Sequence, residues 1–266
     1  MSNTRFITGA SLLFLVAGAG AEESAEDLAK KLSNPVAAMI SVPLQYNYDG
    51  EIGPERDGTK STINIQPVAP FTINEQWNVI SRTILPIIDQ HDVFPGSGNQ
   101  TGIGDITQSL FFSPKKPTSN GLIWGAGPAF LIPTGSEDEL SARKWAIGPT
   151  IVLLKQQGTI TYGALANHLW SVAGDDDRND ISSTFLQPFL SHTTKTAWTY
   201  GINLESSYDW KAEQWSIPIN LTIGKLQKVG GRPMSFTGGV RYWAESTANG
   251  PHGWGARFVV TFLFPK

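Results

Sequence analysis

The sequence predicts a closed, antiparallel transmembrane β-barrel of about twelve strands with a short N-terminal helix. Its clearest sign is residues 254–264, where apolar and other residues alternate. One face of this expected strand is apolar and has aromatic residues at both ends: Trp254, Ala256, Phe258, Val260, Phe262 and Phe264. Such a face is typical of a strand that crosses a bilayer, with lipid on one side and a lumen on the other.

The same period of two recurs along the chain. Most segments have about the 9–11 residues that a tilted barrel strand needs, and their number is even, as single-chain bacterial barrels require. Twelve strands are predicted at about 37–48, 61–71, 77–89, 105–113, 122–133, 145–155, 159–170, 183–192, 197–210, 215–227, 234–244 and 254–264.

The connections between these segments alternate in length, which is the third observation. Short turns are expected near 74–76, 156–158, 193–195 and 229–232, with a longer one at 115–121. Longer, Gly-rich and acidic loops are expected at 49–60, 90–104, 134–144, 171–182 and 245–253. Short periplasmic turns and long extracellular loops are typical of outer-membrane barrels, and both ends of the barrel domain then lie on the periplasmic side.

The N-terminal residues predict export. Arg5, an apolar run around 11–16 and the small residues Ala19-Gly20-Ala21 indicate a cleaved secretory signal over 1–21. Residues 22–36 are expected to hold a short periplasmic helix that Ser24 caps and Pro35 ends. The barrel domain then covers 37–266.

Composition agrees with this location. Charged residues are 16% of the chain, below a typical value of about 25%, and the mean hydropathy of −0.14 is compatible with strands that are only half apolar. There are no cysteines, and a net charge of −3 argues against a nucleic-acid partner. The expected partners are outer-membrane lipids and lipopolysaccharide, a small-molecule solute and the barrel-assembly machinery of a Gram-negative bacterium.

Aromatic residues gather near the ends of the expected strands. Amphipathic rings favour the headgroup level of a membrane, so two girdles are predicted. The periplasmic girdle includes Trp77, Trp124, Trp198 and Phe264, and the extracellular girdle includes Trp210, Trp215 and Trp254.

Polar and charged residues in mid-strand are expected to face the lumen, because a cation facing lipid at the midplane costs roughly 2–4 kcal/mol. The predicted lumen-lining residues are Arg82, Asn203, Glu205, Arg241 and Arg257. They form either a structural network or a constriction that selects solutes. Nearly every later strand also has an inward glycine, which either bends the sheet or leaves space in the lumen.

Catalytic and metal-binding patterns are weak, and no catalytic residue, metal or cofactor is expected. Asn167-His168-Leu-Trp-Ser171 resembles the His and Ser of an outer-membrane phospholipase. Asp175–Asp180 has alternating carboxylates, as a calcium loop does, but lacks the glycine at the sixth position and the distal glutamate.

Three segments together resemble the outer-membrane proteins of the meta-pathway phenol degradation family. They are Gly102-Ile-Gly-Asp105, the run from Trp124 to Gly135, and the run from Tyr162 to Gly174. The resemblance implies a transporter-like channel that admits small molecules, hydrophobic or aromatic ones among them. Passive uptake through the lumen is therefore the first hypothesis. A lipid-modifying hydrolase centred on His168 and Ser171 and a plugged structural barrel are the alternatives.

Overall fold

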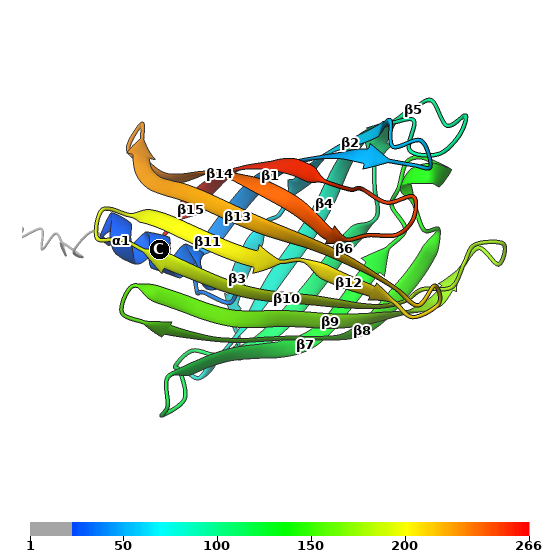
Figure 1. The fold of residues 1–266 in the computed structure, drawn as a ribbon. Coiled ribbons are helices and arrows are strands. Elements are labelled where there is room, and N and C mark those ends of the chain that lie inside the picture. The colour runs from blue at the N-terminus through cyan, green and yellow to red at the C-terminus, as the bar shows by residue number, and fades with distance from the viewer. Residues whose placement is uncertain (1–22, 266) are drawn as a thin grey trace, which may run out of the picture.

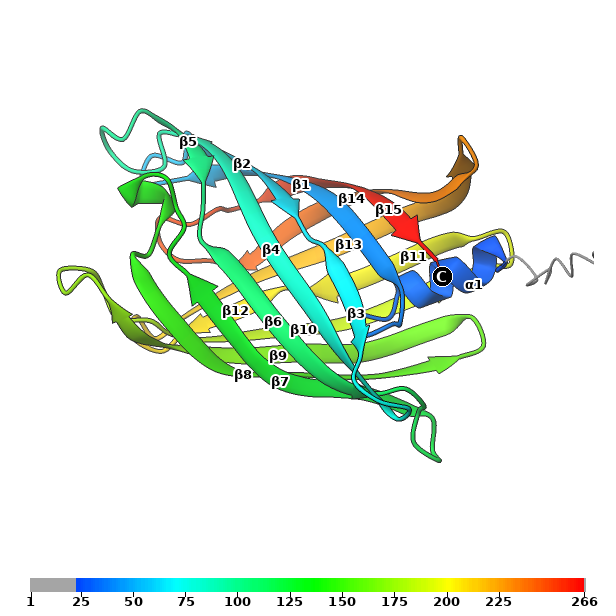
Figure 2. The same cartoon turned by 180° about the vertical axis from the view of Figure 1, so that it is seen from behind.

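A computed structural model describes residues 23–265, so the expected signal segment lies outside the described residues. The fold is a closed, antiparallel, twelve-stranded β-barrel with one short α-helix at its N-terminal end, as predicted (Figures 1 and 2). The helix and the end of the last strand lie at one end of the cylinder together with the short turns, which we call the turn end. The opposite end, with the longer connections, is called the loop end.

Three barrel strands are interrupted, so the twelve strands comprise fifteen segments. The uninterrupted ones are β1 (Ile40–Ile52), β4 (Trp77–His91), β7 (Leu122–Ile132), β8 (Lys144–Gln157), β9 (Ile160–Gly174), β10 (Ser182–Thr193), β13 (Gln214–Val229), β14 (Arg232–Glu245) and β15 (Trp254–Phe264). The interrupted ones are β2 (Gly58–Ile65) with β3 (Val68–Thr72), β5 (Asn99–Ile103) with β6 (Ile106–Pro114), and β11 (Trp198–Leu204) with β12 (Ser206–Asp209).

Each strand pairs with its neighbours in sequence, and β1 closes the cylinder against β15. Nine consecutive residue pairs join β1 to β15, from Ile40 opposite Phe264 to Tyr48 opposite Ala256. Closure leaves no free sheet edge, which is the condition for a β-structure inside a bilayer.

Prolines account for two of the interruptions. Pro67 lies between β2 and β3. Pro188 and Pro218 lie on the strands that flank the break between β11 and β12. Because proline has no N–H, each one removes a bond from the sheet. Pro218 also marks a shift of register between β13 and β14.

Two of the expected loops are shorter than predicted. The strands continue as hairpins into the predicted loop 49–60, where β1 runs to Ile52 and β2 begins at Gly58. They also continue into 90–104, where β4 runs to His91 and β5 begins at Asn99. The loop before β8 contains a short 3₁₀-helix, Asp138–Leu140, that was not predicted.

The barrel is apolar outside, and polar and charged side chains face much of its lumen. In β15 the outward rings of Trp254 and Phe258 are 65% and 58% exposed, whereas the inward Arg257 and Thr261 are 3% and 4% exposed. This is the inverse of a water-soluble sheet protein, and it matches a lipid-facing exterior.

At most of the inward glycines, the neighbouring strand comes too close to leave room for a Cβ atom. A Cβ at Gly148 or Gly255 would lie 1.8 or 2.3 Å from a carbonyl oxygen of the neighbouring strand. These glycines therefore serve curvature. Gly125 is different, because its inner side is filled by Val36, which precedes the barrel wall.

Helix α1 (Ala25–Leu32) is shorter than the predicted 22–36, although its cap is the predicted one. The Ser24 hydroxyl accepts a hydrogen bond from the Asp27 amide at 3.0 Å, which satisfies one free donor of the first turn. Its buried face, Leu28, Ala29 and Leu32, packs on Met39, Ala197, Leu226 and Leu263 inside the turn end. No helix among residues 23–265 is long and apolar enough to cross a membrane.

Candidate functional site: the lumen

Three cavities follow one another along the lumen. The inner cavity, of about 320 Å³, lies between the segment after helix α1 and the barrel wall. The central cavity, of about 400 Å³, shares Gln66, Arg82, Gln187 and Asn203 with it. The outer cavity, of about 540 Å³, shares Gln45, Asn64 and Glu205 with the central one. The shared residues place the three spaces in series from the turn end to the loop end.

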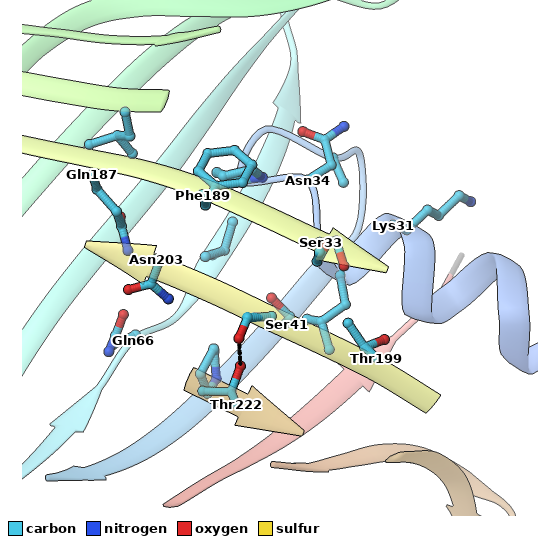
Figure 3. Close-up of a pocket in the computed structure, with 18 of the residues that line it drawn as sticks. Lys31, Ser33, Asn34, Ser41, Gln66, Gln187, Phe189, Thr199, Asn203 and Thr222 are labelled. Carbon is cyan, nitrogen blue, oxygen red and sulfur yellow. Dashed lines mark hydrogen bonds between the residues drawn. The ribbon is translucent and has the colours of Figure 1, made fainter. Parts of the chain in front are cut away.

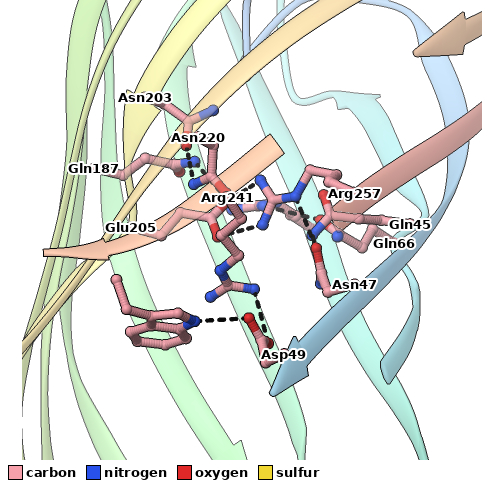
Figure 4. A network of polar contacts seen from close by, with 12 residues as sticks. Gln45, Asn47, Asp49, Gln66, Gln187, Asn203, Glu205, Asn220, Arg241 and Arg257 are labelled. Atoms are coloured by element: carbon pink, nitrogen blue, oxygen red, sulfur yellow. Dashed lines mark hydrogen bonds and ion pairs between the residues drawn. The ribbon is translucent and has the colours of Figure 1, made fainter. Parts of the chain in front are cut away.

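An ion pair crosses the lumen beside the central cavity (Figure 4). The Arg257 guanidinium on β15 donates two hydrogen bonds to the Glu205 carboxylate, at 2.8 and 2.7 Å. Its third bond goes to Asn47 on the adjacent strand, at 2.7 Å. Glu205 lies between β11 and β12, so the pair spans β13 and β14. At the register of Arg257 these strands carry Thr222 and Gly239, whose small size leaves room for the guanidinium.

A second ion pair lines the outer cavity. The Arg241 guanidinium lies 3.3 Å from the Asp49 carboxylate, and the indole N–H of Trp243 donates to the same carboxylate at 2.8 Å. The side chains of Arg241 and Asp49 are 10% and 8% exposed. Lys60 is the register partner of Asp49 and interacts electrostatically with both members of the pair. This cluster narrows the lumen toward the loop end.

Arg82 is bonded differently from the other two lumenal arginines. Within residues 23–265 its single hydrogen-bond partner is a neutral group, the Gln66 side-chain oxygen, at 3.1 Å. Glu205 is close enough to attract Arg82 electrostatically, but both of its oxygens accept bonds from Arg257. Arg82 therefore presents charge to the inner and central cavities, both of which it lines.

The lumen is partly filled at the turn end. Val36 packs into a buried apolar cluster with Ile80, Phe111, Val152, Leu154 and Leu165 on the inner wall. A side chain of β8, Gln156, donates to the Lys30 carbonyl at 2.8 Å and ties the helix to the wall. Figure 3 shows Ser33 and Asn34 of this segment beside the inner cavity, facing Phe189 and Thr199. The N-terminal segment thus forms one wall of the remaining path.

All five residues predicted to line the lumen border these cavities, and the structure brings Glu205 and Arg257 together. Asn203 instead accepts a bond from Asn220 at 2.9 Å. Asp49 and Lys60 were not predicted to line the lumen, because the composition of residues 49–60 resembles that of a loop. The alternation of Gln45 and Asn47 on β1 leads directly to Asp49, so extending that pattern would have found it.

His168 and Ser171, the candidate catalytic residues, are not brought together. The imidazole Nδ1 of His168 is 2.7 Å from the Thr184 hydroxyl, and its Nε2 is buried without a hydrogen-bond partner among residues 23–265. The Ser171 hydroxyl donates instead to Asp180 at 3.1 Å. A nucleophile needs a base within hydrogen-bond reach, and this pair does not provide one.

The acidic loop after β9 is held by basic side chains of the chain itself. Arg178 donates to the carbonyls of Asp138 and Ser141, and Lys144 lies 3.5 Å from the Asp180 carboxylate. The Ser171 hydroxyl and the Lys144 charge lower the pKa of Asp180. No group of three or more His, Asp or Glu side chains within 23–265 could hold a metal ion.

The predicted girdle residues lie at the ends of outward faces. Trp198, Trp210, Trp215, Trp254 and Phe264 are each between 39% and 65% exposed. Trp77 and Trp124 stack edge to face at the turn end, with ring centroids 5.6 Å apart. At the loop end, the ring centroid of Tyr208 lies 4.9 Å from the ring centroids of both Trp210 and Trp215. Their role as membrane anchors stays a prediction.

No protein-family model matches the chain, and no curated protein matches it in sequence. The fold is similar to the crystal structure of an outer membrane channel from Pseudomonas putida F1, at 14% identity and a TM-score of 0.67. That alignment covers 85% of this chain and 96% of the other. This chain has the fold of an outer-membrane barrel.

Two phospholipases share the fold less closely. Outer membrane phospholipase A of Escherichia coli is 8% identical, with a TM-score of 0.50 and coverage of 85% of this chain and 96% of the enzyme. The calcium-bound Salmonella typhi phospholipase dimer is also 8% identical, with a TM-score of 0.50 and coverage of 92% and 99%. At these identities the likeness concerns the fold alone.

Proposed function

We propose that this protein is a channel of the Gram-negative outer membrane that admits small solutes passively through its lumen. The observation that carries the proposal is the series of three cavities along the axis, each with polar and charged side chains in its lining and joined by shared lining residues. A filled barrel core would have no such series. The turn end then faces the periplasm and the loop end the exterior, in keeping with the usual lengths of periplasmic turns and extracellular loops.

The ion pairs and the N-terminal segment set the width of the path. The pairs Arg257–Glu205 and Arg241–Asp49 place side chains in the lumen, and Val36 with helix α1 occupies much of the turn end. A path this narrow suits single small molecules. The similarity of the fold to the outer membrane channel from Pseudomonas putida F1 supports the same class of function. Membership of the meta-pathway phenol degradation family, with its aromatic or hydrophobic solutes, is part of this proposal.

The occupied turn end favours a second candidate, a structural barrel with a plugged lumen. Conductance of the purified protein in planar bilayers distinguishes the two. The channel proposal predicts discrete single-channel steps and swelling of proteoliposomes in small solutes. A barrel that inserts and is folded, but passes neither ions nor any small solute, would support the plugged structure instead.

The hydrolase hypothesis has no assembled site in its favour, because His168 bonds Thr184 and Ser171 bonds Asp180. The hypothesis would be supported if the purified protein hydrolysed phospholipid and the His168→Ala variant did not.

A further inference from the structure

The inner and central cavities carry the opposite sign of charge from the whole chain. The chain carries a net charge of −3. The charged side chains that line the central cavity are Arg82, Arg257 and Glu205, which leaves one cation in excess. The inner cavity is lined by two cations, Lys31 and Arg82, and by no carboxylate among the described residues.

Arg82 is the lumenal arginine that remains available to a solute. Arg257 has its carboxylate partner and Arg241 has Asp49, whereas Arg82 donates to a neutral amide oxygen. A cation withdrawn from water without a counter-charge is unfavourable, so an anionic group that reaches it is stabilised. Guanidinium N–H groups match the two oxygens of a carboxylate in particular.

An apolar surface borders the same space. Phe185 on β10 lines the central cavity, and Phe189 on the same strand lines the inner one. Between them Gln187 lines both cavities, and Figure 3 shows it with Phe189 on one strand at the border of the inner cavity. Leu165 and Leu169 of β9 extend the apolar surface. A solute in this space therefore meets one arginine without an ion-pair partner, several amides and two aromatic rings.

We propose that the lumen selects small amphipathic monocarboxylates, whose carboxylate binds Arg82 while their apolar part contacts Phe185 and Phe189. This inference rests on the proposed channel function and names its class of solute. Acetate has the charge without the apolar part, and benzamide has the ring without the charge. Benzoate has both.

The test uses the full-length protein in planar bilayers with a potassium chloride gradient, followed by addition of sodium benzoate. The reversal potential is expected to show that chloride permeates better than potassium. Benzoate is expected to reduce the chloride current in a saturable way, with benzamide inactive and acetate much weaker.

Variants assign the effect to Arg82. A unit charge about 5 Å from the path changes the local concentration of a monovalent ion about two- to fourfold at low salt. The effect is opposite for anions and cations, so Arg82→Gln should lower the chloride-to-potassium permeability ratio about fivefold and abolish the benzoate effect. Arg82→Lys keeps the charge and should keep the selectivity. Lys116→Gln, in an exposed turn, is the matched control for loss of one positive charge.

The outcomes are separable. A folded wild-type barrel without any conductance refutes the channel itself. A conducting barrel that prefers potassium, ignores benzoate, or behaves alike as wild type and Arg82→Gln overturns this inference and leaves the channel standing.

Discussion

The ion pair across the lumen offers the sharpest test of the interior. Glu205→Ala would leave the Arg257 guanidinium with Asn47 as its remaining hydrogen-bond partner within residues 23–265, in a position where the Arg257 side chain is 4% exposed. Breaking a buried pair on one side typically costs about 3–5 kcal/mol, because the remaining charge is uncompensated. The Glu205 side chain is 19% exposed and borders the central and outer cavities, so the lower end, about 3 kcal/mol, is expected.

The measurement is urea unfolding of the barrel in liposomes, followed by tryptophan fluorescence. Addition of Arg257→Met to Glu205→Ala removes the unpaired charge, so the double variant should lose less stability than Glu205→Ala alone. The exposed pair of Arg143 and Asp138 is the control, and Asp138→Asn should cost less than about 1 kcal/mol. If Glu205→Ala were as stable as wild type, the pair could not be buried in the way described.

Three other predictions follow from separate parts of the barrel. Deletion of residues 23–36 removes helix α1 and Val36 from the turn end, so single-channel conductance should rise severalfold; unchanged conductance would mean that the path does not pass there. Asp105→Asn should weaken the hold on loop 134–143, because the Asp105 carboxylate accepts from the Gly135 and Ala142 amides and the Ser141 hydroxyl at 2.7–3.0 Å. Trypsin is expected to cleave after Arg143 faster in the Asp105→Asn variant than in the wild type. Equal cleavage rates would contradict a role of Asp105 in holding the loop. In single-tryptophan variants, brominated lipids should quench Trp254, which is 65% exposed on the outer face, and spare the lumenal Trp243; equal quenching would contradict the assigned faces.

The sequence predicted the barrel well because strand periodicity is a local signal. Residues 254–264 alternate without interruption, and β15 has those bounds. The parity of the strands also placed Arg82, Arg241 and Arg257 on inward faces. Where composition competed with periodicity the prediction was wrong, as at Asp49 and Lys60, which lie in an acidic, Gly-rich stretch that the hairpin of β1 and β2 partly absorbs.

Contacts between distant strands could not be predicted. Glu205 and Arg257 are 52 positions apart in sequence, and only the closed cylinder brings them together across β13 and β14. Val36 follows the proline that ends the helical pattern and precedes the first predicted strand, so neither the helical period nor the strand period indicates that it is buried. Its position inside the lumen depends on the inner wall around Gly125.

Solute passage past Asn203 is the most direct test of the channel. Because the chain has no cysteines, an introduced cysteine is the single site that a thiol reagent can label. Asn203→Cys places a single thiol on the inner and central cavities, while Leu221→Cys places one on the outer face, where Leu221 is 48% exposed. A bulky, membrane-impermeant thiol reagent added during a bilayer recording should reduce the current of Asn203→Cys irreversibly and leave that of Leu221→Cys unchanged. An unaltered current through a demonstrably labelled Asn203→Cys would contradict passage through the lumen.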